Sequence, residues 1–371
     1  MKTLICLVSA QSAANMNSIN DINPDKVVLM TTSSMTENAN NLMTELKNIG
    51  KSSELFHITQ ENSMQSLSAQ YNNWLNDNIG KCDEIVVNIT GGTKLMSITA
   101  YNVFSDFGVR CFYQNLEPNQ LMWLDDESVI DNIGYNTSLK RYLKIYRFDI
   151  KNSQSLADIP KAHKEYAKLL FEELCYPNNY EYTLSLIGKI NAHTAKKKME
   201  LNNYTLGSDD INVLSELMNE TGLFTLDDNK IKCVDEQART LMNGGWLEII
   251  VADKMRGKDY RDISQSVEIA KSTQRKGVHT NQELDVMAMR GNQLVMVECK
   301  TKKWENATDA SGAIYKLSSL RDIGGLNTYP IFVSLRDLPA SAKTRAAEMG
   351  VKVISGQTDI MALSSKLMEH T

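Results

Sequence analysis

The chain has 371 residues, of which 42% are hydrophobic and 23% are charged, and its formal net charge is -5. This composition is typical of a soluble globular protein with two or three domains. A membrane protein is excluded, because no stretch approaches about 18 consecutive apolar residues. The six cysteines form no CxxC motif and the five histidines form no spaced pair. We therefore expect reduced thiols in a cytoplasmic protein and no structural zinc.

The first 145 residues alternate strand-like and helix-like segments. Such alternation predicts a mainly parallel sheet covered by helices on both faces. In sheets of this kind, ligands bind beyond the carboxyl ends of the strands. We expect strands at residues 4–8, 26–31, 54–58, 83–89 and 109–114, helices at 37–49, 65–78 and 94–107, and a closing hairpin strand at 121–124.

Two segments follow strands of this predicted sheet and are candidates for ligand binding. Small and polar residues from Ser9 to Ala13 come after the first strand. The run Thr90-Gly91-Gly92-Thr93-Lys94 comes after the strand that ends at Ile89 and opens the next helix. A Gly-Gly turn before a helix exposes backbone amides that bind phosphate, and a lysine adds a positive charge. A plain tight turn explains the same run equally well.

Residues 146–235 have the apolar spacing of helices, at 162–174, 183–198 and 209–218. We interpret them as a small helical connector between two domains. A winged-helix DNA-binding module is the alternative, although no clear recognition helix is evident.

The last segment, residues 236–371, contains the most informative pattern of the chain. Two apolar runs, 281–290 and 293–300, flank Gly291-Asn292, which is a typical two-residue hairpin turn. If Arg290 pairs with Gln293, Asp285 faces Glu298 and Glu283 faces Lys300, because paired residues share a face. The other face of this hairpin then carries the apolar set Leu284, Val286, Val297 and Cys299.

The polar face of this hairpin predicts a site for a divalent cation. Mg²⁺ and Mn²⁺ bind hard oxygen ligands such as carboxylates, and a lysine beside them can act on a water or neutralise charge. The alternative is an exposed ladder of ion pairs. Such a ladder would pair acids with bases, whereas here Asp285 is set against Glu298, which is costly without a cation between them.

The spacing of Asp285 and Glu298-Cys299-Lys300 resembles the core of the PD-(D/E)xK nuclease superfamily, with Leu284-Asp285 in place of the usual Pro-Asp. That superfamily often has a further acid on the preceding helix, where this chain has Glu248. The resemblance implies that Glu248, Asp285 and Glu298 hold the metal with the Cys299 carbonyl, and that Lys300 acts on the attacking water. A surface glutamate in the first turn of a helix is the other interpretation of Glu248.

Basic residues cluster in three places: Lys196 to Lys198, Lys271 with Arg275 and Lys276, and Lys300 with Lys302 and Lys303. The last two clusters flank the predicted site, which favours contacts with phosphate over a merely solvated face.

The run from Asn88 to Met96 resembles the signature of CARF domains, which are Rossmann-like sensors of cyclic oligoadenylate in type III CRISPR systems. With the hairpin downstream, and with residues 315–325, the whole chain resembles the CRISPR ancillary nucleases. The implied fold is α/β, with a CARF domain at 1–145 and a restriction-endonuclease-like domain at 236–371. The implied contacts to cyclic tetra-adenylate are Ser9, Ala10, Gln11, Thr31, Thr32, Ser33 and the run from Thr90 to Lys94.

We therefore expect a cytoplasmic endonuclease, activated by cyclic tetra-adenylate and dependent on Mn²⁺ or Mg²⁺, that acts in antiviral defence. Its substrates would be single-stranded DNA or RNA, with nicking of duplex DNA as a further option. The main alternative is a regulator that responds to cyclic oligoadenylate and binds nucleic acid without cutting it. A ring nuclease that degrades its own signal is a weaker alternative. Because a cyclic tetranucleotide has rotational symmetry, we expect a homodimer with one activator on its two-fold axis.

Overall fold

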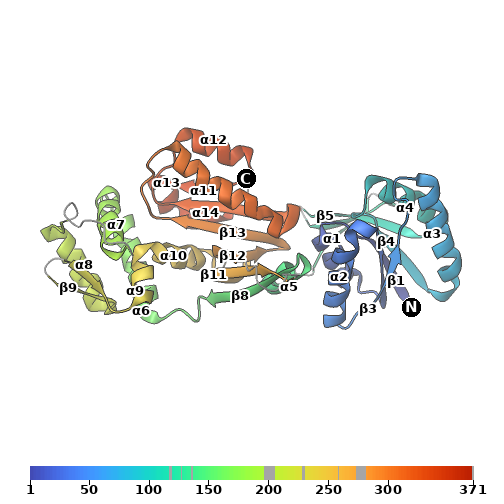
Figure 1. Cartoon of the computed structure of the whole chain (residues 1–371), viewed down its shortest axis with the longest axis horizontal. Helices are drawn as coiled ribbons and strands as arrows, with labels where there is room; N and C mark the ends of the chain where they lie inside the picture. The colour runs from blue at the N-terminus through green and yellow to red at the C-terminus, as the bar shows by residue number, and fades with distance from the viewer. Residues whose placement is uncertain are drawn as a thin grey trace.

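The structure is a computed structural model that describes residues 1–116, 119–126, 128–134, 137–195, 205–227, 230–257, 259–272 and 281–369. Two sheets and a group of helices follow one another along the longest axis of the molecule (Figure 1). The sheet formed by the first part of the chain lies at one end, a second sheet lies in the middle, and helices α6 to α9 lie at the other end.

The first sheet has the strand order β3-β2-β1-β4-β5-β6-β7. Its first five strands run parallel and the last two run antiparallel, which confirms the predicted mainly parallel sheet with a closing hairpin. Alternation of buried residues along β1 explains the layers, because Leu4 and Cys6 pack on one side while Ile5 and Leu7 pack on the other. The strands are β1 Lys2–Leu7, β2 Lys26–Thr31, β3 Ser52–His57, β4 Glu84–Asn88, β5 Arg110–Asn115, β6 Gln120–Trp123 and β7 Ile130–Asn132.

Helices cover both faces of this sheet, as the sequence predicts. Residues of α1 and α2 pack in the cluster that contains Leu4, and residues of α3 and α4 pack in the cluster that contains Ile5. Helix α4 begins at Lys94 because the Thr93 side chain accepts a hydrogen bond from the Met96 N–H, as an N-cap residue does. The helices are α1 Ser12–Ile22, α2 Thr36–Asn48, α3 Met64–Asn78 and α4 Lys94–Asp106.

The second sheet has the order β15-β14-β13-β12-β11-β8. The predicted hairpin is confirmed, because β12 and β13 are antiparallel with Arg290 opposite Gln293. Strand β14 then pairs parallel to β13, and β15 pairs parallel to β14. The strands are β8 Phe148–Ser155, β11 Tyr260–Lys271, β12 Gln282–Arg290, β13 Gln293–Lys300, β14 Thr328–Ser334 and β15 Lys352–Ser355, and the helices among them are α11 Ala307–Ser319, α12 Ala340–Glu348, α13 Gly356–Met361 and α14 Leu363–Met368.

The connector is not entirely helical, because it opens with the strand β8, which pairs with β11 at the edge of the second sheet. The residues of β8 are mostly polar and exposed, so they show no alternation of apolar side chains that would predict a strand. A two-stranded hairpin also follows the three helices of the connector. These elements are α6 Lys161–Cys175, α7 Tyr180–Thr194, α8 Ser208–Thr221, β9 Phe224–Asp227 and β10 Lys230–Cys233.

Three helices followed by a hairpin is the element order of a winged helix, the alternative considered for this segment. Helix α8, which precedes the hairpin, would be the recognition helix of such a module. It carries Asp209, Asp210, Glu216 and Glu220 and contains no lysine or arginine. A helix with this charge repels DNA phosphates, which argues against DNA reading by this part of the chain.

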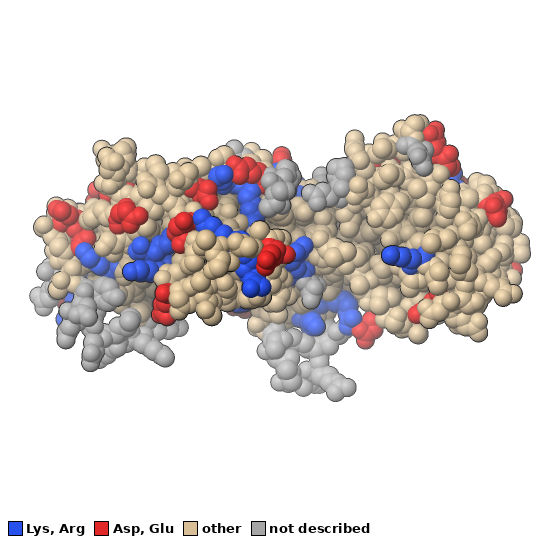
Figure 2. Space-filling model, turned by 90° about the horizontal axis from the view of Figure 1, so that it is seen from above, with Lys and Arg blue, Asp and Glu red and all other residues tan. Residues whose placement is uncertain are grey.

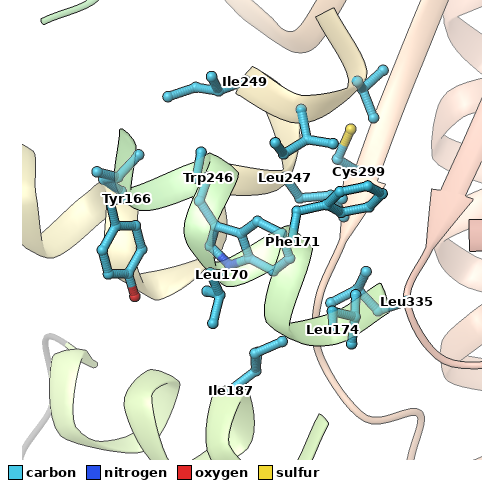
Figure 3. Packing of buried hydrophobic residues seen from close by; sticks show 14 of the residues in the cluster. Tyr166, Leu170, Phe171, Leu174, Ile187, Trp246, Leu247, Ile249, Cys299 and Leu335 are labelled. Atoms are coloured by element: carbon cyan, nitrogen blue, oxygen red, sulfur yellow. The ribbon is translucent and has the colours of Figure 1, made fainter. Parts of the chain in front are cut away.

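The connector helices instead form a core with one face of the second sheet. After α9 (Glu236–Thr240) and a π-helical turn (Leu241–Gly245), helix α10 (Trp246–Met255) leads into that core. Figure 3 shows Trp246 among side chains of α6, with Leu247 beside Cys299 of β13. Trp246 is fully buried, so α10 is fixed between the connector and the strand that carries Glu298.

The other face of the second sheet shares a core with the first sheet. Helix α5 (Leu139–Ile145) contributes Leu139 and Tyr142 to a cluster that contains Leu4 of β1 and also Met287 and Met296 of the hairpin. This continuous apolar contact joins the two sheets of one chain into a single packed unit. Within the described residues, the helices are too short or too polar to cross a membrane.

Candidate active site and sensor site

The alternation of β12 is broken at Asp285. Two residues that are two positions apart in a strand normally share a face. Leu284 and Val286 instead lie on opposite faces, and Leu284 shares its face with Met287, three positions away. Leu284 packs with Met287 on the side of α5, whereas Val286 packs on the side of α10. The expected apolar face with Leu284 beside Val286 is therefore wrong. The break coincides with a left-handed residue of β11, because Ser266, located between the partners of Val286 and Leu284, has a φ of 46°.

Asp285 takes the place of a hydrogen bond of the β12–β13 ladder. In a regular hairpin with this register, the Cys299 N–H would bond to the carbonyl of Leu284. Instead, Asp285 Oδ2 accepts the Cys299 N–H at 2.6 Å, and pairing of the described residues of β12 and β13 ends at Val286–Val297. The expected pairing of Glu283 with Lys300 is not formed, because Glu283 lies beyond the end of that ladder. On the other side of β12, Glu283 pairs with Glu268 of β11.

Lys300 bridges the two carboxylates of the hairpin, as the sequence predicts for one shared site. Its Nζ lies 2.5 Å from Glu298 Oε1 and 3.6 Å from Asp285 Oδ2. The same Nζ donates to the Cys299 carbonyl at 3.1 Å. Burial would lower the pKa of Lys300, but the charges of Asp285 and Glu298 outweigh it and raise this pKa. Lys300 is therefore a cation within the site.

Glu248 joins this group from helix α10. The Ser266 hydroxyl lies 3.5 Å from Glu248 Oε2, so the irregular position of β11 faces this helix. Burial, followed by the charge of Asp285, raises the pKa of Glu248 well above its usual range. Burial likewise raises the pKa of Asp285 to about 6, although Lys300 opposes the shift. Nearby positive charge therefore does not fully offset the cost of burying the ionised forms of Glu248 and Asp285.

The donor chemistry of this group fits a divalent cation, but its arrangement in the structure is closed. Among the described residues, no three His, Cys, Asp or Glu side chains converge closely enough to hold a metal ion. Lys300 Nζ instead lies among Glu298, Asp285 and the Cys299 carbonyl, the groups expected to be ligands. An ammonium in this position supplies the positive charge that three acids need.

A second lysine, which the sequence analysis did not assign, reaches the same carboxylate. Lys316 of α11 is 64% exposed, and its Nζ lies 3.9 Å from Glu298 Oε1. Its charge also acts to lower the pKa of Asp285. A helix that crosses the carboxylates could not be placed from sequence spacing, because α11 is separated from β13 by a loop.

The turn before α10 contacts the residue after Lys300, which the sequence did not indicate. Gly244 has a φ of 122°, and a Cβ at this position would lie 2.9 Å from Thr301 Oγ1, directly after Lys300. The Thr301 hydroxyl accepts a hydrogen bond from Asn191 of α7 at 3.2 Å. The signal available in the sequence is the Gly-Gly pair that precedes the helix, because only glycine adopts this φ readily.

The sensor segments meet at the point where the strand order of the first sheet reverses, between β1 and β4. This reversal is where open α/β sheets bind ligands. A Cβ on Gly91 would lie 2.0 Å from the Leu7 carbonyl oxygen, so the loop after β4 touches the end of β1. Gly92 has a φ of 76°, and Thr93 and Lys94 are exposed.

Other predicted contacts lie around this crevice. Thr31 and Thr32 are buried at the end of β2, and Ser33 is exposed. Ser9 and Ala10 follow β1, and the Ser9 hydroxyl accepts the Gln11 N–H at 3.2 Å. Gln11 faces the second sheet, since its Oε1 accepts the Leu326 N–H at 2.9 Å.

Gln114 is a polar residue of this region that the sequence did not indicate. Its backbone N–H donates to Thr90 Oγ1 at 2.6 Å, which ties β5 to the predicted phosphate loop. Its side-chain amide is fully buried, and neither polar atom has a hydrogen-bond partner in the described part of the chain.

Basic side chains gather over the middle of the molecule, where the second sheet lies (Figure 2). Lys302 is half-exposed and bound to Asp309 at 2.7 Å, and Lys303 is exposed. Lys271 ends β11 and is exposed. The other predicted basic residues, Lys196 to Lys198 with Arg275 and Lys276, lie outside the described residues.

Two family models match the chain. The model of the Card1 CARF domain matches residues 3–142, and the model of the Card1-like endonuclease domain matches residues 235–371. No curated protein matches the chain.

Solved structures share the whole fold. Protein VC1899 from Vibrio cholerae is 20% identical, with a TM-score of 0.83 over 99% of this chain and 97% of that one. Can2 from Sulfobacillus thermosulfidooxidans, solved in complex with cyclic tetra-adenylate, is 21% identical, with a TM-score of 0.80 over 99% and 98%. A type III CRISPR defence DNA nuclease activated by cyclic oligoadenylate is 15% identical, with a TM-score of 0.59 over 91% and 47%.

The two matched segments coincide with the first sheet and with the helix and hairpin that bear the carboxylates. The chain thus belongs to the family of CARF-domain CRISPR ancillary nucleases, with a Card1-type CARF domain followed by a Card1-like endonuclease domain.

Proposed function

We propose that this protein is a metal-dependent endonuclease of the PD-(D/E)xK type that cyclic tetra-adenylate switches on in type III CRISPR defence. The observation that carries the proposal is the convergence of Glu298, Asp285 and Lys300. Three acids and a lysine gathered at a buried and half-buried site are costly to fold, so their presence favours a chemical role.

The residues have distinct tasks in this proposal. Glu248, Asp285, Glu298 and the Cys299 carbonyl would hold Mn²⁺ or Mg²⁺, which polarises the phosphodiester and lowers the pKa of a water. Lys300, which lies between Glu298 and Asp285, would orient the attacking water or neutralise the phosphate. Lys316, exposed beside Glu298, provides a positive charge for the incoming strand.

The sensor function rests on the crevice between β1 and β4. The backbone amides around Gly91 and Gly92, together with Lys94 at the start of α4, are suited to bind a phosphate of the activator. Ser9, Ala10 and Thr31 to Ser33 would line the same site. Can2, the similar structure, was solved with cyclic tetra-adenylate, which supports this ring as the ligand of the proposed site.

A regulator that binds nucleic acid without cutting it is the alternative, and no specific observation favours it. Carboxylates at a binding face repel phosphate, and the acidic helix α8 does not provide another face. We also propose a cytoplasmic location, in keeping with six cysteines that are all free thiols.

One assay tests the proposal. Purified protein is incubated with labelled single- and double-stranded DNA and RNA, each with and without Mn²⁺ and with cyclic tri-, tetra- or hexa-adenylate. Cleavage of one strand type that requires metal and is strongly stimulated by cyclic tetra-adenylate above a low basal rate is the expected result. Nucleic-acid binding without cleavage under all conditions would favour the regulator, and cleavage that is equally fast with and without an activator would exclude the sensor function.

A further inference from the structure

The turn of the catalytic hairpin is docked into the CARF domain. An exposed position would be usual for a two-residue turn, yet Asn292 is only 2% exposed. Its Oδ1 accepts the backbone N–H of Thr137 at 2.8 Å, and its Nδ2 donates to Asn119 Oδ1 at 3.3 Å. Asn119 directly precedes β6 of the first sheet, and Thr137 lies between β7 and α5, so both partners belong to the segment that matches the CARF model.

These contacts continue to the sensor loop through a buried polar chain. The Thr137 hydroxyl donates to Asn17 Oδ1 at 2.8 Å, and both residues are fully buried. Asn17 lies on α1, which begins directly after the loop Ser9 to Gln11. Any displacement of α1 that follows occupation of this loop thus acts on the turn of the hairpin.

A second contact converges on the same turn. Gln11 accepts the Leu326 N–H, and Asn327 donates its side-chain N–H to the Asn292 carbonyl at 2.9 Å. Only glycine fits at position 325, because Gly325 has a φ of 67° and a Cβ there would lie 2.6 Å from Gln11 Oε1. The sensor loop thus reaches Asn292 by two routes, one through α1 and one through residues 325–327.

The hairpin itself carries a displacement to the carboxylates. Its strands run from Asn292 to Asp285 and Glu298 with regular pairing as far as Val286–Val297, a span of roughly 20 Å at about 3.4 Å per residue. Packed strands move as a unit, and their residues on both faces are buried here. A displacement of the turn at Asn292 therefore moves the other end of the hairpin, beyond the Val286–Val297 pair, where Asp285 and Lys300 lie.

We infer that Asn292 is a positioning residue that couples the CARF domain to the catalytic hairpin, so that activator binding sets the spacing of Asp285 and Glu298. The inference rests on the proposed function. Asn292 touches no substrate, and a structural role alone would affect cleavage with and without activator equally.

The test compares Asn292→Ala with the wild type in the cleavage assay. The backbone tolerates alanine here, because the positive φ of the turn belongs to Gly291. We expect the ratio of activated to basal cleavage to fall at least tenfold, while basal cleavage with Mn²⁺ and the Kd of cyclic tetra-adenylate stay within about twofold. Thr137→Val, which removes only the hydroxyl that bonds Asn17, should lower the same ratio. Thr137→Ser, which keeps this hydroxyl, should leave the ratio at the wild-type value.

The control is Asn132→Ala, which removes an exposed asparagine of β7 with a hydrogen bond to Gln120 and should leave the ratio unchanged. An unchanged ratio in both Asn292→Ala and Thr137→Val would overturn the inference while the activated nuclease stands. Wild-type protein without activated cleavage would overturn the proposed function and this inference together. If Asn292→Ala does not fold, Thr137→Val alone decides, because it leaves the turn intact.

Discussion

The Asp285 carboxylate accepts the Cys299 N–H at 2.6 Å and thereby replaces a backbone hydrogen bond of the hairpin ladder with one to a side chain of the candidate site. The same Oδ2 oxygen lies 3.6 Å from Lys300 Nζ, so it links the strand to the lysine of the candidate site. Because this oxygen is set by backbone geometry, substitutions of Asp285 should affect position as well as charge.

Glu298→Ala and Lys300→Ala should each reduce activated cleavage by at least about 100-fold, or about 3 kcal/mol of barrier. Glu298 is a proposed metal ligand, and Lys300 is the only described residue that contacts both Glu298 and Asp285 as a cation in the structure. Rates from single-turnover assays measure the loss, and EDTA should abolish wild-type cleavage. Glu305→Ala, an exposed acid nearby in sequence, serves as the control. Full activity of Glu298→Ala would exclude this site.

The stability of the metal-free protein should fall as the pH rises from about 4 to about 6. The folded-state pKa of Asp285 is raised to about 6 from the usual 3.8, so the folded state holds a proton that the unfolded state has already released. This contribution is fully present below the unfolded pKa and is lost as the pH rises through the folded pKa. The loss should be on the order of 3 kcal/mol for this one group.

Denaturant unfolding in EDTA at several pH values measures this loss. Asp285→Asn, which keeps an oxygen for the Cys299 N–H, should lack it, so the two proteins should differ most in their dependence on pH between 4 and 6. Parallel curves would show that Asp285 does not carry the shift. Added Mn²⁺ should stabilise the wild type more than the variant at pH 7.

Gly244→Ala should reduce cleavage at least tenfold and destabilise the protein by about 1–3 kcal/mol. An alanine cannot adopt a φ of 122° without strain, and its Cβ would press on the Thr301 hydroxyl beside Lys300. Gly257→Ala is the matched control, because its φ of 66° is also positive but no atom lies within 4 Å of a Cβ. Thr301→Ala in the Gly244→Ala background should restore part of the activity, and no restoration would show that backbone strain alone is responsible.

How far the sequence predicts the site depends on whether a residue belongs to a regular element. The register of β12 and β13 follows from Gly291-Asn292, so Asp285, Glu298 and Lys300 could be grouped from sequence alone. The break of alternation at Asp285 could not, because it coincides with the left-handed backbone of Ser266 on another strand, which no pattern within β12 indicates. Lys316 and Thr137 likewise reach their partners through tertiary packing, which no short-range pattern records.

Lys94→Ala should weaken the binding of cyclic tetra-adenylate about tenfold, and Gly92→Val should weaken it further. Lys94 provides an exposed charge at the start of α4, and a side chain at Gly92 would meet Leu7 and Met96 at 3.2 and 3.3 Å and displace the amides of the loop. Calorimetry measures both affinities. Gly108→Val is the control, because its φ of 71° imposes the same strain with open space around it. Unchanged affinity in both test variants would place the ligand elsewhere.

The proposed homodimer should bind one cyclic tetra-adenylate for every two chains. The ring has rotational symmetry, so a two-fold axis would present the run Thr90 to Lys94 twice and contact opposite phosphates equivalently.

Within one chain, the CARF and endonuclease domains share a continuous core through α5, so they should not separate when the activator binds. The change on activation should therefore be a small shift of the hairpin together with a rotation of one chain against the other. An activator drives this change only if it binds the cutting arrangement more tightly than the resting one. Light scattering with calorimetric titration gives the mass and the stoichiometry, and a saturated monomer or one ring per chain would exclude a shared site.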